Sequence, residues 1–249
     1  MNFLITGATS GLGNCIFKEL SKDSSNKIFI ISKNKEILDK IKLENENTKV
    51  YHFNLNNINE LEKIADKIII DSKNKIDVLI CNAGQGSFGA VEDVPVENYI
   101  EDINVNFVSH LILIKKVYRI MKQSDFGHII NISSGTAVFG FKNTSSYSAS
   151  KSGMQIVIES MYVENLNNNI YPKNMFPGLI ESDFDKKNKF YGKIEKIPLI
   201  KKKNVDLIAK KIVKNLFSKK LNIFCQPSPF IAFFIKAFPV LEKIRKFIF

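Results

Sequence analysis

The sequence has few of the residues that build metal centres or disulfide frameworks. It contains three histidines and three cysteines, Cys15, Cys81 and Cys225, in 249 residues. The cysteines lie far apart and none belongs to a Cys-x-x-Cys pair, so neither a disulfide framework nor a zinc site is indicated. We therefore expect no metal, and three small buried thiols in a reducing cytosol.

Arginine is almost absent as well. Arg119 and Arg245 are the only two, so all but two of the 36 basic residues are lysines, and the formal net charge is +11. Nucleic-acid-binding proteins favour arginine for bidentate contacts, and these lysines are spread along the whole chain. We expect no nucleic-acid partner, but a solvated lysine-rich surface with some attraction to anionic cofactors or membranes.

The first residues leave no room for a targeting segment. Met1 is followed at once by the short run Asn2-Phe-Leu-Ile-Thr6 and then by Gly7. A leader would need a charged region, an apolar region and a cleavage site. We expect the mature chain to begin in its first strand and the protein to be cytoplasmic.

Short apolar runs alternate with longer stretches of helical period, which predicts a β-α-β-α order. Continuous apolar strands are buried on both faces, so the pattern favours a parallel sheet with helices on each side. The fold class is therefore α/β, a single doubly wound Rossmann domain of three layers. The expected strands are 3–5, 28–31, 50–53, 78–81, 128–132 and 170–176, and the expected helices are 58–70, 100–121, 149–166 and 205–217.

The chain divides into a main domain and a terminal extension. We expect the Rossmann domain over residues 1–225, including a mobile, lysine-rich lid at 183–203 that would cover a ligand crevice. Residues 226–249 are predicted to form an apolar and basic helical extension, whose uninterrupted apolar part is too short to span a bilayer. Two interpretations stay open: a helix that closes the substrate pocket or a subunit interface, and a peripheral membrane contact through 229–249.

The long apolar helices predicted at 100–121 and 149–166 are candidates for a subunit interface. We expect a homodimer or homotetramer.

Tyr147 and Lys151 form the motif that most indicates chemistry. Four residues apart on a helix, they share one face. A nearby ammonium stabilises a phenolate and can lower the pKa of tyrosine from about 10 towards neutrality, where it works as a general acid or base. In so lysine-rich a chain about one such pair is expected by chance, and a second exists, Tyr118 with Lys122.

A glycine-rich turn follows the first predicted strand directly. It reads Thr6-Gly7-Ala8-Thr9-Ser10-Gly11-Leu12-Gly13 and opens a helix. In this context glycines let a pyrophosphate approach the backbone at a helix N-terminus. The turn predicts a nucleotide site.

With its Gly-x-x-x-Gly-x-Gly spacing, the chain resembles the short-chain dehydrogenase/reductase family in its compact form. Cys81-Asn82-Ala83-Gly84 and Pro177-Gly178 also match family motifs, and the resemblance runs from Thr6 to about Ser182, with the same element order continuing to Cys225. It implies an NAD(P)-dependent oxidoreductase that moves a hydride between nicotinamide and a carbonyl or secondary alcohol.

The resemblance implies four catalytic residues. Ser134 lies thirteen residues before Tyr147 and would hydrogen-bond the substrate oxygen, while Tyr147 exchanges a proton with it. Lys151 would lower the tyrosine pKa and hold the nicotinamide ribose. Asn106 would help to hold a water that connects Lys151 to solvent, and it fits the family motif better than Asn104.

Tyr118 has no serine at a preceding strand end. It is therefore expected to be structural, with Lys122 solvated.

The resemblance also implies a cofactor site at the carboxyl ends of the strands. Its expected residues are Gly7, Thr9, Ser10, Gly11, Leu12, Gly13, Ser32, Lys33, Asn54, Leu55, Asn82, Ala83, Gly84, Tyr147, Lys151, Pro177, Gly178, Ile180 and Ser182. Lys33 follows the second strand with no carboxylate before Glu36, so charge complementarity favours NADP(H) over NAD(H). Asn54 replaces an aspartate common in relatives, which predicts weaker adenine contacts, and Ser182 would contact the carboxamide.

The loops after Gly84 and Ser134 are mainly small or aromatic. Because they offer no cluster of cations, they favour an apolar carbonyl substrate. The alternative function is a catalytically silent nucleotide sensor, or a membrane-peripheral scaffold, with the same fold. All four catalytic residue types are present, which favours the enzyme.

Overall fold

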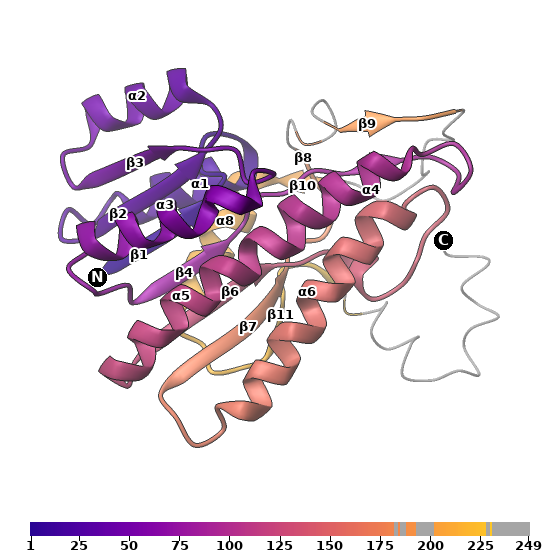
Figure 1. Ribbon diagram of the computed structural model, residues 1–249. Coiled ribbons are helices and arrows are strands. Elements are labelled where there is room, and N and C mark those ends of the chain that lie inside the picture. Colours follow the sequence, from indigo (N-terminus) through magenta and orange to yellow (C-terminus); the bar gives the residue numbers. More distant parts are fainter. Residues whose placement is uncertain (182–183, 185–187, 193–201, 228–229, 231–249) are drawn as a thin grey trace.

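The computed structural model describes residues 1–181, 184, 188–192, 202–227 and 230. Strands and helices alternate along the chain, as the apolar pattern predicts (Figure 1). The central strands are β1 (Asn2–Thr6), β2 (Lys27–Ser32), β3 (Thr48–His52), β4 (Val78–Cys81), β6 (Gly127–Ile132), β7 (Ile170–Phe176) and β11 (Asn222–Phe224). The helices are α1 (Gly11–Leu20), α2 (Lys35–Glu44), α3 (Ile58–Asp71), α4 (Val96–Ile103), α5 (Ser109–Ser124), α6 (Ser145–Glu164) and α8 (Val205–Lys214).

The seven central strands form one parallel sheet in the order β11-β7-β6-β4-β1-β2-β3. The chain order reverses between β1 and β4. At such a switch point the loops after neighbouring strands run in opposite directions and leave a crevice at the carboxyl ends. The predicted doubly wound Rossmann fold is confirmed, and its ligand crevice is expected beyond Thr6 and Cys81.

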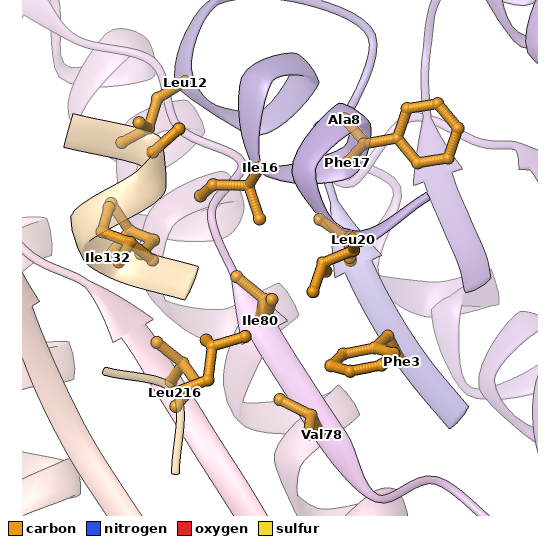
Figure 2. Packing of buried hydrophobic residues seen from close by; sticks show 14 of the residues in the cluster. Phe3, Ala8, Leu12, Ile16, Phe17, Leu20, Val78, Ile80, Ile132 and Leu216 are labelled. Carbon is orange, nitrogen blue, oxygen red and sulfur yellow. The ribbon is translucent and has the colours of Figure 1, made fainter. Parts of the chain in front are cut away.

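Two layers of apolar side chains cover the two faces of the sheet. One cluster joins the sheet to α1, α2 and α8, and the other joins it to α3, α5 and α6. Successive residues of β4 enter opposite clusters, Leu79 one and Ile80 the other. Figure 2 shows Ile80 with Ile16 of α1 and Leu216 among its neighbours. Burial on both faces explains why the strands are continuously apolar.

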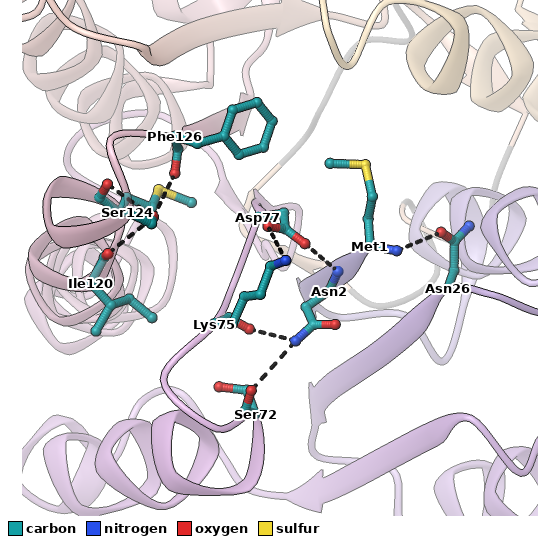
Figure 3. Close-up of polar contacts among 10 residues, drawn as sticks. Met1, Asn2, Asn26, Ser72, Lys75, Asp77, Ile120, Ser124 and Phe126 are labelled. Carbon is teal, nitrogen blue, oxygen red and sulfur yellow. Dashed lines mark hydrogen bonds and ion pairs between the residues drawn. The ribbon is translucent and has the colours of Figure 1, made fainter.

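Polar contacts hold the amino ends of the central strands, at the end of the sheet opposite the crevice (Figure 3). The Asn2 amide N–H donates to the Asp77 carboxylate at 2.7 Å, and the Asn2 side chain donates to the Lys75 carbonyl at 2.7 Å. These bonds join the start of β1 to the segment that leads into β4. They therefore help to set the register of the two strands on which the crevice depends.

The helix predicted over 100–121 has three parts. α4 is followed by a π-helical turn, Asn104–Val108, and then by α5. α6 begins at Ser145 instead of residue 149, so Tyr147 lies in its first turn. The short strands β5 (Ser87–Phe88), β8 (Ile180–Glu181), β9 (Lys189–Phe190) and β10 (Lys203–Asn204) form two small parallel pairs, β5 with β9 and β8 with β10, that the sequence pattern did not predict.

Most of the predicted lid, 183–203, and of the extension, 226–249, lies outside the described residues. The described part of the lid includes residues 188–192 and contains β9. Within the described parts of the chain, no helix is both long and apolar enough to cross a membrane.

Replacing Ile80 with alanine should lower the free energy of unfolding by about 2–5 kcal/mol, because it leaves a cavity at a fully buried position in the central sheet. Ile70→Ala is the matched control, since Ile70 is 74% exposed and should change stability by no more than about 0.5 kcal/mol. Urea unfolding monitored by circular dichroism measures both. Equal losses in the two variants would contradict this description of the core.

Candidate active site

The glycine-rich turn after β1 is packed too tightly for side chains. Gly7 has a φ of +71°, and a Cβ there would lie 2.8 Å from the Ala83 Cα. A Cβ on Gly13 would overlap the Gly7 carbonyl oxygen and the Asn82 side chain. The turn therefore requires glycine, and it leaves the N-terminus of α1, which begins at Gly11, facing the crevice.

Asn82 ties this turn to the end of β4. Its side-chain amide donates to the carbonyl oxygens of Thr6 at 3.0 Å and Gly7 at 3.2 Å. The Thr6 hydroxyl in turn accepts the backbone N–H groups of Asn82 and Ala83, both at 3.0 Å. The predicted Asn-Ala-Gly segment thus supports the glycine-rich turn through four hydrogen bonds.

His110 is a buried member of this network that no sequence motif singled out. Its Nε2 lies 3.0 Å from the Thr6 hydroxyl, and its Nδ1 lies 3.2 Å from the Asn106 carbonyl oxygen. Because Thr6 already accepts two N–H groups, its hydroxyl donates to Nε2, and we assign the proton of the ring to Nδ1. Burial, together with the charge of Lys151, lowers the pKa of His110 to about 3, so the ring stays neutral.

Asn106 lies in the π-helical turn and faces the site. Its Oδ1 accepts the Gln85 N–H at 3.0 Å, and its Nδ2 donates to the Gln85 carbonyl at 2.7 Å and to the Ser150 hydroxyl at 2.8 Å. Asn104 instead donates to Asn56 at 3.1 Å, away from Ser150. A π-helical turn is a frequent feature of functional sites, because its extra residue redirects side chains. Of the two asparagines, Asn106 is the one that contacts the loop at Gln85 and the residue before Lys151.

Lys151 is 3% exposed and reaches from α6 to the end of β6. Its ammonium donates to the Ile132 carbonyl at 3.0 Å and lies 5.9 Å from the centre of the Tyr147 ring. Burial lowers the pKa of Lys151 to about 8. The group therefore stays mainly protonated at neutral pH.

The pKa of Tyr147 differs from the sequence-based expectation. Burial raises it above the usual tyrosine value, a hydrogen bond with Ser134 lowers it, and the charge of Asp102 raises it further. The prediction that Lys151 brings this pKa towards neutrality is wrong for the chain as described, because desolvation of the phenolate outweighs the favourable contacts. The Ser134 hydroxyl also accepts the Thr136 N–H at 3.2 Å.

The expected cofactor residues lie in three groups: the glycine-rich turn with residues 82–84, the ends of β2 and β3, and the segment after β7. At the β2 end, the Thr9 and Ser32 hydroxyls lie 2.6 Å apart and Lys33 is exposed. Lys33 and Asn54 line a cavity of about 170 Å³, whose other lining residues are Asn56, Gln85, Gly86, Ser87, Glu101, Asp102 and Lys189. The side chains of Leu12 and Leu55 lie in the core, so only their backbones could face a ligand.

The third group follows β7. Gly178 has a φ of +78°, and the Gln226 side chain donates to the carbonyl oxygens of Pro177 at 2.7 Å and Leu179 at 2.9 Å. Ile180 pairs with Lys203 in the small β8–β10 sheet. Ser182 lies outside the described residues.

Aromatic side chains border Tyr147 on the side of the loop after Gly84. The Phe88 ring centre lies 5.6 Å from that of Tyr147 and 5.5 Å from that of Phe190, on which it stacks. The Tyr191 hydroxyl donates to Asn98 at 2.9 Å, and Lys189 pairs with Glu101 at 2.7 Å. These contacts hold residues 188–192 against α4 and the loop. Their signal in the sequence is only an aromatic pair within a basic stretch.

Tyr118 has a different environment from Tyr147. Its hydroxyl donates to the Asn165 side chain at 2.9 Å, and Lys122 lies over its ring at 5.2 Å. The geometry fits the structural role expected for Tyr118.

Comparisons with known proteins agree with this arrangement. A family model described as short chain dehydrogenase matches residues 2–190. The chain is 32% identical over 200 residues to a 3-oxoacyl-acyl-carrier-protein reductase of Rickettsia conorii, covering 79% of this chain and 80% of the relative.

Two solved structures share the fold. A short-chain dehydrogenase/reductase from Burkholderia phymatum in complex with NAD has a TM-score of 0.82 at 16% identity, covering 97% of this chain and 94% of its own. A short-chain dehydrogenase from Burkholderia cenocepacia in complex with NADP has a TM-score of 0.80 at 20% identity, covering 98% and 96%.

Gly7→Ala should lower the free energy of unfolding by about 1–3 kcal/mol, because it combines a positive φ with a steric overlap at Ala83. Gly153→Ala is the control. A Cβ there would make an ordinary 3.5 Å contact with Phe107 inside α6, so this variant should be neutral or slightly stabilised. Urea unfolding compares the two, and a Gly7 variant as stable as the Gly153 variant would contradict the packing described for the turn.

Proposed function

Since the chain belongs to the short-chain dehydrogenase family of NAD(P)-dependent oxidoreductases, we propose that it is an NADPH-preferring reductase of apolar carbonyl compounds. The observation that carries the proposal is the convergence of Asn106, Ser134, Tyr147 and Lys151 at the carboxyl end of the sheet. They come from three segments, the π-helical turn, the loop after β6 and α6, and the glycine turn lies beside them across Asn82 and Ala83.

In the proposed mechanism Tyr147 is the proton donor to the substrate oxygen. Its raised pKa keeps the phenol protonated across the neutral range, which suits reduction of a carbonyl. Ser134, which hydrogen-bonds the phenol, would also hydrogen-bond the substrate oxygen as negative charge develops there. The nicotinamide, when bound, supplies the hydride.

Lys151 and Asn106 support this proton transfer. The buried ammonium of Lys151 would hold the nicotinamide ribose and stabilise the phenolate that remains after Tyr147 gives up its proton. Asn106 fixes the loop at Gln85 and the hydroxyl of Ser150, the residue before Lys151. In this proposal it also helps to hold a water that connects Lys151 to solvent.

The glycine-rich turn supports a dinucleotide site, because its tight packing excludes side chains at Gly7 and Gly13 and leaves the N-terminus of α1 facing the crevice. Lys33 supports NADP(H) over NAD(H). It is exposed at the end of β2, and the first carboxylate after it, Glu36, is paired with Lys40 at 2.8 Å. One structure with this fold holds NAD and another holds NADP, so the fold does not distinguish the two cofactors. The proposed preference for NADP(H) rests on Lys33.

An apolar substrate is supported by the aromatic side chains beside Tyr147. Phe88 and Phe190 stack on one another, and Phe88 contacts the tyrosine ring. The Rickettsia relative is named for a 3-oxoacyl group. We propose a ketone of this kind, with an apolar chain next to the carbonyl.

A homodimer or homotetramer remains part of the proposal. Exposed apolar residues on α4 and α6, including Val96, Ile100, Ile156 and Val163, support an interface between copies of the chain. The proposed division into residues 1–225 and 226–249, and a membrane contact through 229–249, concern mainly residues outside those described.

Tyr147→Phe should lower kcat for carbonyl reduction by at least about 100-fold, because it removes the only proposed proton donor. NADPH affinity should remain within about threefold, and Tyr118→Phe should stay near wild type. An assay of NADPH oxidation over a panel of carbonyl compounds, with NADPH binding followed by fluorescence, makes both measurements. Wild-type turnover by the Tyr147 variant would disprove the assignment, and no turnover by wild type on any compound would favour the silent nucleotide sensor.

Lys33→Ala should raise the KM for NADPH by about tenfold, the effect of losing one cation close to a phosphate, and leave the KM for NADH unchanged. Lys42→Ala, which removes an exposed lysine from the last turn of α2, should alter neither value. Initial-rate kinetics with each cofactor test this prediction. Equal changes in the two KM values after Lys33→Ala would contradict the proposed 2′-phosphate contact.

A further inference from the structure

Asp102 is a buried carboxylate next to the candidate active site. It is fully buried at the end of α4, and among the described residues it forms no ion pair. Its hydrogen bonds come from the Ser146 hydroxyl at 2.6 Å, the Ser87 N–H at 2.8 Å and the Gln85 side chain at 3.3 Å. Burying a carboxylate is costly unless such donors replace water.

These bonds form part of a regular connection between two helical segments. Asp102 binds Ser146, the residue before Tyr147, and Asn106 binds Ser150, the residue before Lys151. Asp102 and Asn106 are four residues apart on one segment, and Ser146 and Ser150 are four residues apart on the other. The two bonds therefore tie each end of the Tyr147–Lys151 turn to the segment that contains α4 and the π-helical turn.

Asp102 also holds the loop that contacts the tyrosine ring. Its bonds to Gln85 and Ser87 precede Phe88, whose ring lies 5.6 Å from that of Tyr147. The carboxylate lies at the N-terminus of α6, where the helix dipole favours negative charge. One side chain thus fixes both Tyr147 and the apolar side chain against it.

We propose that Asp102 is a positioning residue that fixes Tyr147 for proton transfer and favours its protonated, proton-donating form. This inference rests on the proposed reductase function. Asp102 touches neither cofactor nor substrate in the proposal, and it acts through Ser146 and through its charge. That charge is one of the causes that raise the pKa of Tyr147.

The other charged and titratable groups near Tyr147 do not replace Asp102. Lys151 on α6 lies 5.9 Å from the centre of the Tyr147 ring, where a positive charge favours the phenolate. Cys81 of β4 and His110 of α5 interact with Lys151 and are neutral, because burial raises the pKa of the thiol and lowers that of the imidazole. From β9, Lys189 is paired with Glu101. Asp102 is the charge that opposes Lys151 among these groups.

Asp102→Asn tests the inference, because it removes the charge and keeps the shape. In the pH profile of kcat, the limb assigned to Tyr147 should move to lower pH by roughly one unit. Reduction would then decline at a lower pH, while alcohol oxidation, which needs the phenolate, would begin at a lower pH. Kcat for reduction at pH 7 should fall about tenfold with the KM for NADPH within about twofold.

Two further variants separate charge from position. Ser146→Ala removes one hydrogen bond but keeps the carboxylate, so it should lower kcat without moving the pH limb. Glu97→Gln removes an exposed charge from the first turn of the same helix and should leave both unchanged. If Asp102→Asn does not fold, Asp102→Glu is used, and it should keep the wild-type limb while Ser146→Ala still lowers kcat.

The inference is overturned if Asp102→Asn keeps the wild-type pH profile, if Glu97→Gln moves the limb as far as Asp102→Asn does, or if Ser146→Ala keeps the wild-type kcat. In each case wild type still turns over and Tyr147→Phe does not. Failure of the proposed function is a different result, because wild type itself would then be inactive.

Discussion

Two hydrogen bonds between helical segments hold the candidate site together: Asp102 with Ser146, and Asn106 with Ser150. They join the segment around the π-helical turn to the first turns of α6. The side chains of Asp102 and Asn106 also hold the loop at Gln85. The position of Tyr147 and Lys151 relative to Ser134 and the glycine-rich turn depends on this connection. A shift of α6 would separate the proton donor from Ser134 and Asp102, which lie on other segments.

Burial decides the charge of each group around this connection. A low dielectric disfavours isolated ions, and it lowers the pKa of His110 to about 3 but that of Lys151 only to about 8. At neutral pH the imidazole is therefore neutral and the ammonium is still mainly charged. The phenol of Tyr147 keeps its proton for the same reason. The site holds a buried lysine, Lys151, and a buried carboxylate, Asp102, near a neutral phenol.

The sequence predicted the features that depend on local pattern. Continuous apolar strands indicated the parallel sheet, and a glycine-rich turn between a strand and a helix indicated its nucleotide crevice. The spacing of Ser134, Tyr147 and Lys151 indicated the chemistry. It could not predict features set by distant neighbours. Asp102 and His110 are ordinary helix residues until the fold buries them, and the tyrosine pKa was expected in the wrong direction because spacing carries no information on desolvation.

The central claim is that this site transfers a hydride to a carbonyl compound. The most direct measurement uses NADPH that carries deuterium on the transferred position of the nicotinamide ring, together with a panel of apolar ketones and mass spectrometry of the products. The account predicts an alcohol that has gained one deuterium from the cofactor. Tight NADPH binding with no deuterated alcohol from any ketone would contradict it.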